Sequence, residues 1–266
     1  MDKYNINNNG TKQNSTKYEE RIVAYVDILG FKDLVNKSKS DSSIYEKIKR
    51  SLDTINNVKK ESEKFQGFKT QIGDKVSTFS DSIIISYPAR DKDPLYSIVI
   101  ELMYLQGNLL SQGISVRGGI AKGLVRHVGD MCFGPALIDA YELESKYAIY
   151  PRIIMEKELV EWQEKKYLEQ EYGAQSDIND LRELLKLDEY NDIYYIDVLG
   201  RYEEFDYFTD YISFLNTVKK IIINGLSENK TVKKKYIWLK NYYNDVINNL
   251  NISNKEQLRI SDDITA

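Results

Sequence analysis

The pattern of hydrophobic and polar positions alternates between strand-like and helix-like stretches. Short runs rich in β-branched and aromatic residues predict strands, and apolar residues spaced by three and four predict amphipathic helices. Pro94 begins one of these helices, as proline favours the first helical turn. The predicted elements are a strand at 21–29, helical material at 32–65 with a break near 36–43, strands at 75–79 and 82–87 joined by a tight turn, a helix at 94–112, a strand at 114–123, a helix at 135–147 and a strand at 152–155.

This order of elements predicts an α+β fold. Strands and helices that alternate around a central antiparallel hairpin indicate a ferredoxin-like palm, a sheet with helices packed on one face. Beyond it, 156–190 is charged and helical, and 192–200 is compatible with a further strand. Two amphipathic helices, at 205–223 and 231–250, are expected to add packing or a surface for self-association. We therefore expect three parts: a disordered N-terminus at 1–20, a catalytic palm domain at 21–155, and a mostly helical C-terminal extension packed on it at 156–266.

The composition narrows the classes of function. The 266 residues carry 37 Lys and Arg against 41 Asp and Glu, a net charge of −4, which argues against a nucleic-acid partner. One cysteine, Cys132, and one histidine, His127, exclude an internal disulfide and a histidine-rich metal centre, so a bound metal would be a hard cation held by oxygens. No apolar stretch approaches the roughly 18 residues of a membrane span, and the N-terminus has no hydrophobic targeting region. We expect a cytoplasmic protein without membrane contact.

Two aspartates follow apolar strand residues. Asp27 lies near the end of the first strand in 25-YVDILGF-31, where an unpaired buried carboxylate would cost several kcal/mol, so it needs a partner or a cation. Asp81 lies in the turn of 79-FSDSIIIS-86, and a palm places this hairpin beside the first strand. Two carboxylates at neighbouring strand ends predict a site for two Mn²⁺ or Mg²⁺ ions that bridge a triphosphate. The turn at 28–32 opens a helix whose first amides suit phosphate oxygens.

Each feature taken alone has a simpler interpretation. A lone aspartate at a strand end is most often a helix cap or a turn former. The glycine-rich stretch 117–123 most often indicates a strand that another backbone approaches closely.

Four segments together resemble the motifs of class III nucleotide cyclases. YVDILGF resembles their first metal motif, FSDSIIIS their second-aspartate hairpin, 116-VRGGIAKG-123 the strand that leads into their dimer interface, and 134-GPALIDAYELE-144 their transition-state helix. The spelling is most similar to the pyrimidine cyclases of bacterial anti-phage systems, the Pycsar cyclases. The resemblance covers about 21–155. It implies a homodimer with composite active sites, two Mn²⁺ or Mg²⁺ ions held by Asp27, Ile28 and Asp81, and a cyclic pyrimidine mononucleotide that activates an antiviral effector.

The resemblance also implies which residues meet the nucleotide. The expected contacts are Tyr25, Gly30, Phe31, Ser77, Phe79 and Met131. Ser77 and Met131 stand where purine cyclases carry the residues that read the base edge. Ser77 is too short for that role and Met131 is only a weak acceptor, so we expect a pyrimidine, with UTP preferred to CTP.

The resemblance leaves open which cation meets the phosphates. Ile138 and Glu142 stand where these enzymes carry the Asn and Arg that orient the ribose and stabilise the α-phosphate. The candidates in their place are Lys122, Arg126, Lys146 and Arg152, with Arg117 as an alternative structural ion-pair partner. Two other functions stay open: a catalytically silent palm that binds nucleotide, and a purine cyclase.

Overall fold

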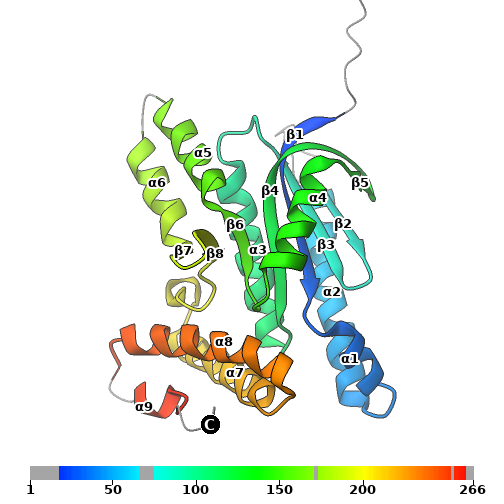
Figure 1. Ribbon diagram of the computed structural model, residues 1–266, viewed down its shortest axis with the longest axis vertical. Helices are drawn as coiled ribbons and strands as arrows, with labels where there is room; N and C mark the ends of the chain where they lie inside the picture. Colours follow the sequence, from blue (N-terminus) through cyan, green and yellow to red (C-terminus); the bar gives the residue numbers. More distant parts are fainter. Residues whose placement is uncertain (1–17, 66–74, 171–172, 253–254, 262–266) are drawn as a thin grey trace, which may run out of the picture.

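A computed structural model describes residues 18–65, 75–170, 173–252 and 255–261; most of the N-terminal segment expected to be disordered lies outside them. The described strands form one mixed sheet in the order β2-β3-β1-β4-β6-β8-β7, with β5 paired to β4 (Figure 1). The strands are β1 (Glu19–Ile28), β2 (Lys75–Phe79), β3 (Ser82–Pro88), β4 (Val116–Val128), β5 (Met131–Phe133), β6 (Ile153–Glu156), β7 (Leu185–Asp188) and β8 (Ile193–Ile196). The predicted α+β class and the central hairpin are confirmed.

Helices cover both faces of this sheet. They are α1 (Phe31–Lys37), α2 (Ser42–Phe65), α3 (Pro94–Ser111), α4 (Pro135–Glu142), α5 (Lys157–Leu168), α6 (Ala174–Glu183), α7 (Phe208–Leu226), α8 (Lys230–Asn249) and α9 (Lys255–Leu258). A single turn of π-helix, Leu143–Tyr147, continues α4. None of the helices in the described part of the chain is long and apolar enough to cross a membrane.

The register of β1 separates the two faces of the sheet. Ile22, Ala24 and Val26 are buried on one face. The partly buried Tyr87 of β3 lies on the same face, and its hydroxyl donates to Glu101 of α3. Tyr25 and Asp27 lie on the other face, where the Tyr25 ring meets that of Tyr141 on α4 in an edge-to-face contact. The expectation of helices on one face is therefore wrong, because α4 and the π-helical turn pack on the second face (Figure 1).

Gly119 explains how this second helical layer lies so close to β4. A Cβ atom at Gly119 would stand 2.3 Å from the Ala140 carbonyl oxygen and 2.5 Å from the Leu143 Cβ. The close backbone approach that the glycine-rich stretch predicts is confirmed at this position. It falls where α4 passes into the π-helical turn, so the predicted helix at 135–147 is not a single regular one.

The chain beyond residue 156 adds strands as well as helices to the fold. The predicted strand in 192–200 appears as β8, whereas β7 interrupts the expected helical stretch 156–190. Both strands continue the sheet from β6. The two predicted amphipathic helices appear as α7 and α8, which pack against each other beside the ends of α3 and β4 (Figure 1).

Candidate active site

Asp27 and Asp81 meet at one end of β1. Asp27 pairs with Ser82 in the antiparallel register of β1 and β3, and the Ile28 amide donates to the Asp81 carbonyl at 3.3 Å. Ser80 and Asp81 form the two-residue turn between β2 and β3, with Ser80 in the left-handed region at φ 56°. This turn places the Asp81 carboxyl group close enough to the Asp27 carboxyl group to raise its pKa. The structure thus brings the two predicted aspartates together.

Burial and the neighbouring Asp81 carboxyl group raise the pKa of Asp27. Its pKa rises from 3.8 to about 6, first through burial, then through the negative charge of Asp81 and the hydrogen bond between them, and then through Glu144. A hydrogen bond from Ser82 acts in the opposite direction. The negative charge of Asp81 opposes ionisation of Asp27 unless a cation neutralises it.

Oxygen ligands of this kind suit Mg²⁺ or Mn²⁺, so the donor set fits the predicted ions. Among the residues that the structure describes, no three His, Cys, Asp or Glu side chains form a group that could hold a metal. A cation here would therefore need backbone, water or phosphate oxygens in addition to the two carboxylates. The Ile28 side chain is buried and apolar, so this residue could contribute only its backbone carbonyl.

Two hydroxyl groups orient the Asp27 carboxylate. Ser82 Oγ donates to Asp27 Oδ1 at 3.2 Å, and the Tyr25 hydroxyl lies 2.9 Å from the same Ser82 oxygen. Because Ser82 donates its only proton to Asp27, the Tyr25 hydroxyl donates to Ser82. Ser82 is not among the site residues predicted from the sequence. With a two-residue turn at 80–81, this serine is the first residue of β3. Because β3 was expected beside the first strand, that position would have placed Ser82 next to Asp27.

Arg117 and Glu144 form an ion pair next to the aspartates. Arg117 pairs with Asp27 in the register of β1 and β4, and its Nε lies 2.6 Å from Glu144 Oε1 in the π-helical turn. The Arg117 charge is therefore taken up by a buried carboxylate, as the structural alternative for this residue expects. The pKa of Glu144 is raised overall, because the effect of burial exceeds the opposing effect of the Arg117 charge.

The turn after β1 has the geometry expected of a helix entry. Gly30 precedes α1 in the left-handed conformation, φ 77°, and is exposed. Phe31 is the first helical residue and is partly buried against the core. The amides of Asp33 and Leu34 donate to the Gly30 carbonyl, so the amides of Phe31 and Lys32 are the donors that the start of α1 can present to an anion.

Ser77 lies inside a buried polar network. Its hydroxyl donates to the Gly129 carbonyl at 3.0 Å and lies 2.7 Å from His127 Nε2, while Ser86 Oγ lies 2.7 Å from His127 Nδ1. Arg21 Nε donates to that Ser86 oxygen, so Ser86 donates to Nδ1, and Nε2 of a neutral imidazole carries the proton. Burial, together with Arg21 and Lys75, lowers the pKa of His127 to about 4. The network fixes the far end of β4 across β2 and β3.

Two further residues expected to contact the nucleotide, Phe79 and Met131, are exposed. Phe79, at the end of β2, has 83% of its surface exposed, and Met131 of β5 has 55%. Strand β5 was not predicted from the sequence, because a strand of three residues is too short to show an alternating pattern.

Three of the four candidate phosphate-binding cations, Lys122, Lys146 and Arg152, have carboxylate partners. Lys122 pairs with Glu20 at 2.5 Å and lies over the Trp162 ring, and Lys146 pairs with Glu142 at 2.8 Å. Lys122 stands opposite Ile22, about 17 Å along the strand from Asp27 at ~3.4 Å per residue. Arg126 also has interactions of its own, near the opposite end of β4 from Arg117.

Arg152, the fourth candidate, is almost completely buried. Its guanidinium lies 2.7 Å from Asp188 and packs against the rings of Tyr150, Tyr195 and Trp238. These contacts tie β6 to β7, β8 and α8.

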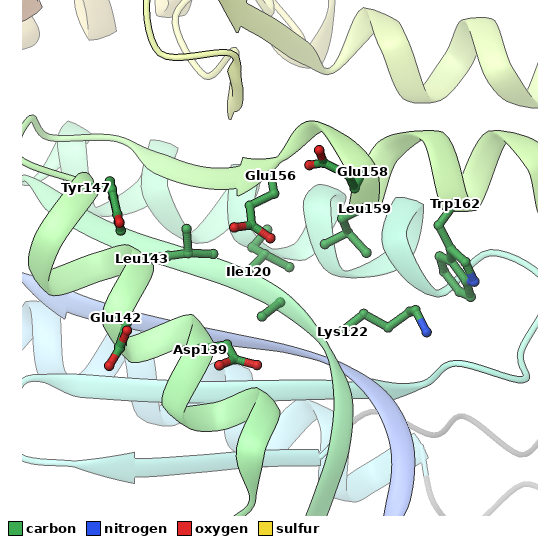
Figure 2. Close-up of a pocket in the computed structure, with 11 residues that line it drawn as sticks. Ile120, Lys122, Asp139, Glu142, Leu143, Tyr147, Glu156, Glu158, Leu159 and Trp162 are labelled. Carbon is green, nitrogen blue, oxygen red and sulfur yellow. The ribbon is translucent and has the colours of Figure 1, made fainter.

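A cleft of about 460 Å³ lies on the same sheet face as the aspartates, between α4 and α5 (Figure 2). Figure 2 shows four carboxylates around it: Asp139, Glu142, Glu156 and Glu158. Lys122 is the one cationic side chain among the described residues that line it, and Glu20 already neutralises that charge. Such a lining repels a triphosphate, so we place the candidate active site at Asp27 and Asp81 instead.

The comparisons with known proteins give similarity to solved structures alone. No family model and no curated protein matches the chain. The adenylyl cyclase CyaB from P. aeruginosa is 12% identical, with 67% of this chain and 94% of that chain covered and a TM-score of 0.44. A bacterial light-regulated adenylyl cyclase is 12% identical, with 73% and 97% covered and a TM-score of 0.38. A class III adenylyl cyclase-like ATP-binding protein from Pseudomonas aeruginosa is 10% identical, with 92% and 73% covered and a TM-score of 0.39. At these values the similarity identifies no activity and no residue.

Proposed function

We propose that the protein is a nucleotide cyclase that converts a nucleoside triphosphate into a 3′,5′-cyclic mononucleotide and pyrophosphate. The observation that carries this proposal is the meeting of Asp27 and Asp81 at the end of β1, with the pKa of Asp27 raised to about 6. Two carboxylates held against each other, beside a helix entry, suit a metal-bound polyphosphate. The cyclase-like motifs of the sequence occupy these same positions.

In this reaction the ribose 3′-oxygen forms a bond to the α-phosphorus, and the bond from that phosphorus to the pyrophosphate oxygen breaks. Bound Mn²⁺ or Mg²⁺ would lower the pKa of the hydroxyl and neutralise charge on the phosphates. Asp27 and Asp81 would hold the ions, and the Tyr25 and Ser82 hydroxyls would keep the Asp27 carboxylate in position. The first amides after Gly30 would bind phosphate oxygens.

We further propose a homodimer, in which a partner chain completes each site. Large apolar side chains are exposed at the end of β2, on β5 and on α4: Phe79, Met131, Phe133, Ile138 and Tyr141. They border the sheet face that carries Asp27. Apolar surface gathered in one region of a protein most often marks an interface.

The finer part of the proposal is a pyrimidine substrate, with UTP preferred to CTP, and a product that acts as a second messenger in anti-phage defence. The Ser77 hydroxyl is occupied by His127 and Gly129, which leaves it no proton to donate to a base. Phe79 and Met131 offer apolar surface instead. The choice of UTP and the defensive role rest on the resemblance to the Pycsar cyclases.

The test is a competition among equal concentrations of ATP, GTP, CTP and UTP with Mn²⁺, with the products identified by mass spectrometry. We expect cyclic UMP to dominate, and Asp27→Asn or Asp81→Asn to lower the rate by at least ~10²-fold through the loss of metal charge stabilisation. Asp53→Asn, an exposed site on α2, is the matched control and should keep full activity.

Each of the other possible outcomes refutes a different part of the proposed function. Cyclic AMP or cyclic GMP as the main product would refute the pyrimidine assignment alone. Nucleotide binding without any cyclic product would favour a silent palm, and full activity of either variant would refute the site.

A further inference from the structure

Lys235 of α8 lies beside the turn that follows Asp27. Together with Leu29 and Gly30 it lines a groove of about 770 Å³ between α1 and the helix pair α7 and α8. The ammonium group is also within electrostatic reach of the Arg117–Glu144 ion pair, and Glu144 acts in turn on Asp27. Lys235 therefore lies next to the Gly30 turn, where the proposed function places phosphate oxygens, although more than 200 positions separate it from Asp27 in the sequence.

The charges of this groove are not balanced. Of the four lysines that line it, Lys37 is paired with both lining carboxylates, to Asp33 at 2.8 Å and to Glu228 at 3.3 Å. The structure gives Lys235 no carboxylate within 4 Å among the residues it describes, although the side chain is partly buried. Burial lowers the pKa of Lys235, and the nearby Arg117 lowers it further. An ammonium group in such surroundings is stabilised by any anion that enters.

Close packing holds Lys235 in this place. The next residue, Tyr236, lies directly on Gly225 of α7, where an added Cβ would stand 2.1 Å from the ring. The contact lets α7 and α8 approach each other closely and fixes the rotation of α8. The side chain at 235 is thereby directed toward the groove instead of into open solvent.

We propose that Lys235 is a phosphate-binding residue of the active site, supplied by helix α8 from outside the predicted palm domain. The identity of its anion, the terminal phosphates of a nucleoside triphosphate, rests on the proposed function. Near the aspartates, Asp27, Asp81 and Glu144 outnumber Arg117, whose charge Glu144 already takes up. A triphosphate adds further negative charge, and Lys235 is placed to offset it from the side of the groove.

The test uses inorganic tripolyphosphate as the probe, titrated calorimetrically in Mg²⁺ buffer into the full chain. Lys235→Met should weaken binding by about tenfold or more, the scale of one lost charge-assisted contact, and Lys235→Arg should largely restore it. Lys234→Met is the matched control, because it removes the same charge from the next, exposed position of α8 and should bind as the wild type does. With the substrate nucleotide, we expect Lys235→Met to raise KM more than it lowers kcat.

A measurement on the wild-type protein covers the case of a variant that does not fold. Saturating tripolyphosphate should slow the acetylation of Lys235 by acetic anhydride several-fold, and leave Lys234 unchanged, as read by peptide mass spectrometry. Absence of protection, or Lys235→Met binding as tightly as Lys234→Met, would overturn the inference. A chain that makes no cyclic nucleotide but binds tripolyphosphate through Lys235 would instead refute only the proposed cyclase function. A cyclase whose Lys235→Met kinetics equal the wild type would refute only the role of Lys235.

Discussion

Replacing Asp27 by asparagine should stabilise the metal-free protein at neutral pH. The Asp27 carboxyl group is partly buried and lies against Asp81, and its pKa rises from 3.8 to about 6. In the folded state it therefore resists ionisation, whereas in the unfolded chain it ionises freely. Asparagine keeps the shape of the side chain and a hydrogen bond to Ser82, but it has no charge that would be buried beside Asp81 in the folded state.

The sign of the pH dependence follows from this raised pKa. A carboxyl group whose folded pKa exceeds its unfolded pKa contributes fully to stability below about pH 4 and loses that contribution as the pH rises through about 6. The difference of about two pKa units corresponds to at most ~3 kcal/mol. Solvent reaches part of this carboxyl group, and screening reduces the expected effect to about 1–2 kcal/mol.

The assay is urea denaturation in EDTA at pH values from 4 to 7.5, for the wild type and for Asp27→Asn. The useful quantity is the difference in unfolding free energy between the two proteins. His127, whose pKa is lowered to about 4, makes both proteins less stable as the pH falls below its unfolded value of 6.5, and this contribution cancels in the difference. The difference should rise in favour of Asp27→Asn from near zero at pH 4 to its full value near pH 7.

Added Mn²⁺ should reverse the order at pH 7.5. An ion that binds both carboxylates stabilises the wild-type protein in proportion to its occupancy, and Asp27→Asn should gain little. Asp53→Asn serves as the exposed control and should follow the wild type at every pH. A variant that is less stable than the wild type in EDTA, or equal stabilisation of both by Mn²⁺, would show that the two carboxylates do not form the repulsive pair and cation site described above.

Two further predictions test the surroundings of the site. Gly119→Ala should destabilise the protein by about 1–3 kcal/mol and weaken any cyclase activity, because the new methyl group would stand 2.3 Å from the Ala140 carbonyl oxygen. Urea denaturation measures the loss of stability, and an unchanged unfolding free energy would mean that α4 can move away from β4 at no cost. His127→Phe should lower the unfolding free energy by about 1–3 kcal/mol at pH 7, because the hydrogen bonds to Ser77 and Ser86 are lost. The variant should also lose less stability than the wild type between pH 6.5 and pH 4, because it has no imidazole to protonate on unfolding. The same pH dependence in both proteins would contradict a buried neutral imidazole at 127.

Local patterns were sufficient to predict the meeting of the two aspartates. An apolar strand that ends at Asp27 and a two-residue turn at Asp81 each leave a signature a few residues long, and a palm needs their strands to pair. The same reasoning predicted the close approach at Gly119, because a glycine in a strand indicates missing space for a side chain.

Features that depend on distant partners could not be predicted in this way. Arg152 looks like a surface charge in the sequence, yet Asp188 and three aromatic rings from other segments enclose it. The neighbourhood of Lys235 depends on how α8 crosses the end of the sheet, which the spacing of residues within α8 does not determine. Contacts between residues more than 30 positions apart produce no local sequence pattern around either residue.

The position of Ser77 changes the reasoning about base selection. Its length alone argued against a purine, because a short hydroxyl does not reach the base edge that lysine or glutamate would reach. The stronger reason is that this hydroxyl already donates to Gly129 and accepts from His127. A longer polar residue at this position would have to leave the buried network, and His127 would lose a partner. In the proposed cyclase, selectivity for the base would then come from surfaces that remain open, of which Phe79 and Met131 are the exposed examples on β2 and β5. Both side chains are apolar, so they would contact a base by stacking and van der Waals packing more than by hydrogen bonds, and the four-nucleotide competition measures which base they accept.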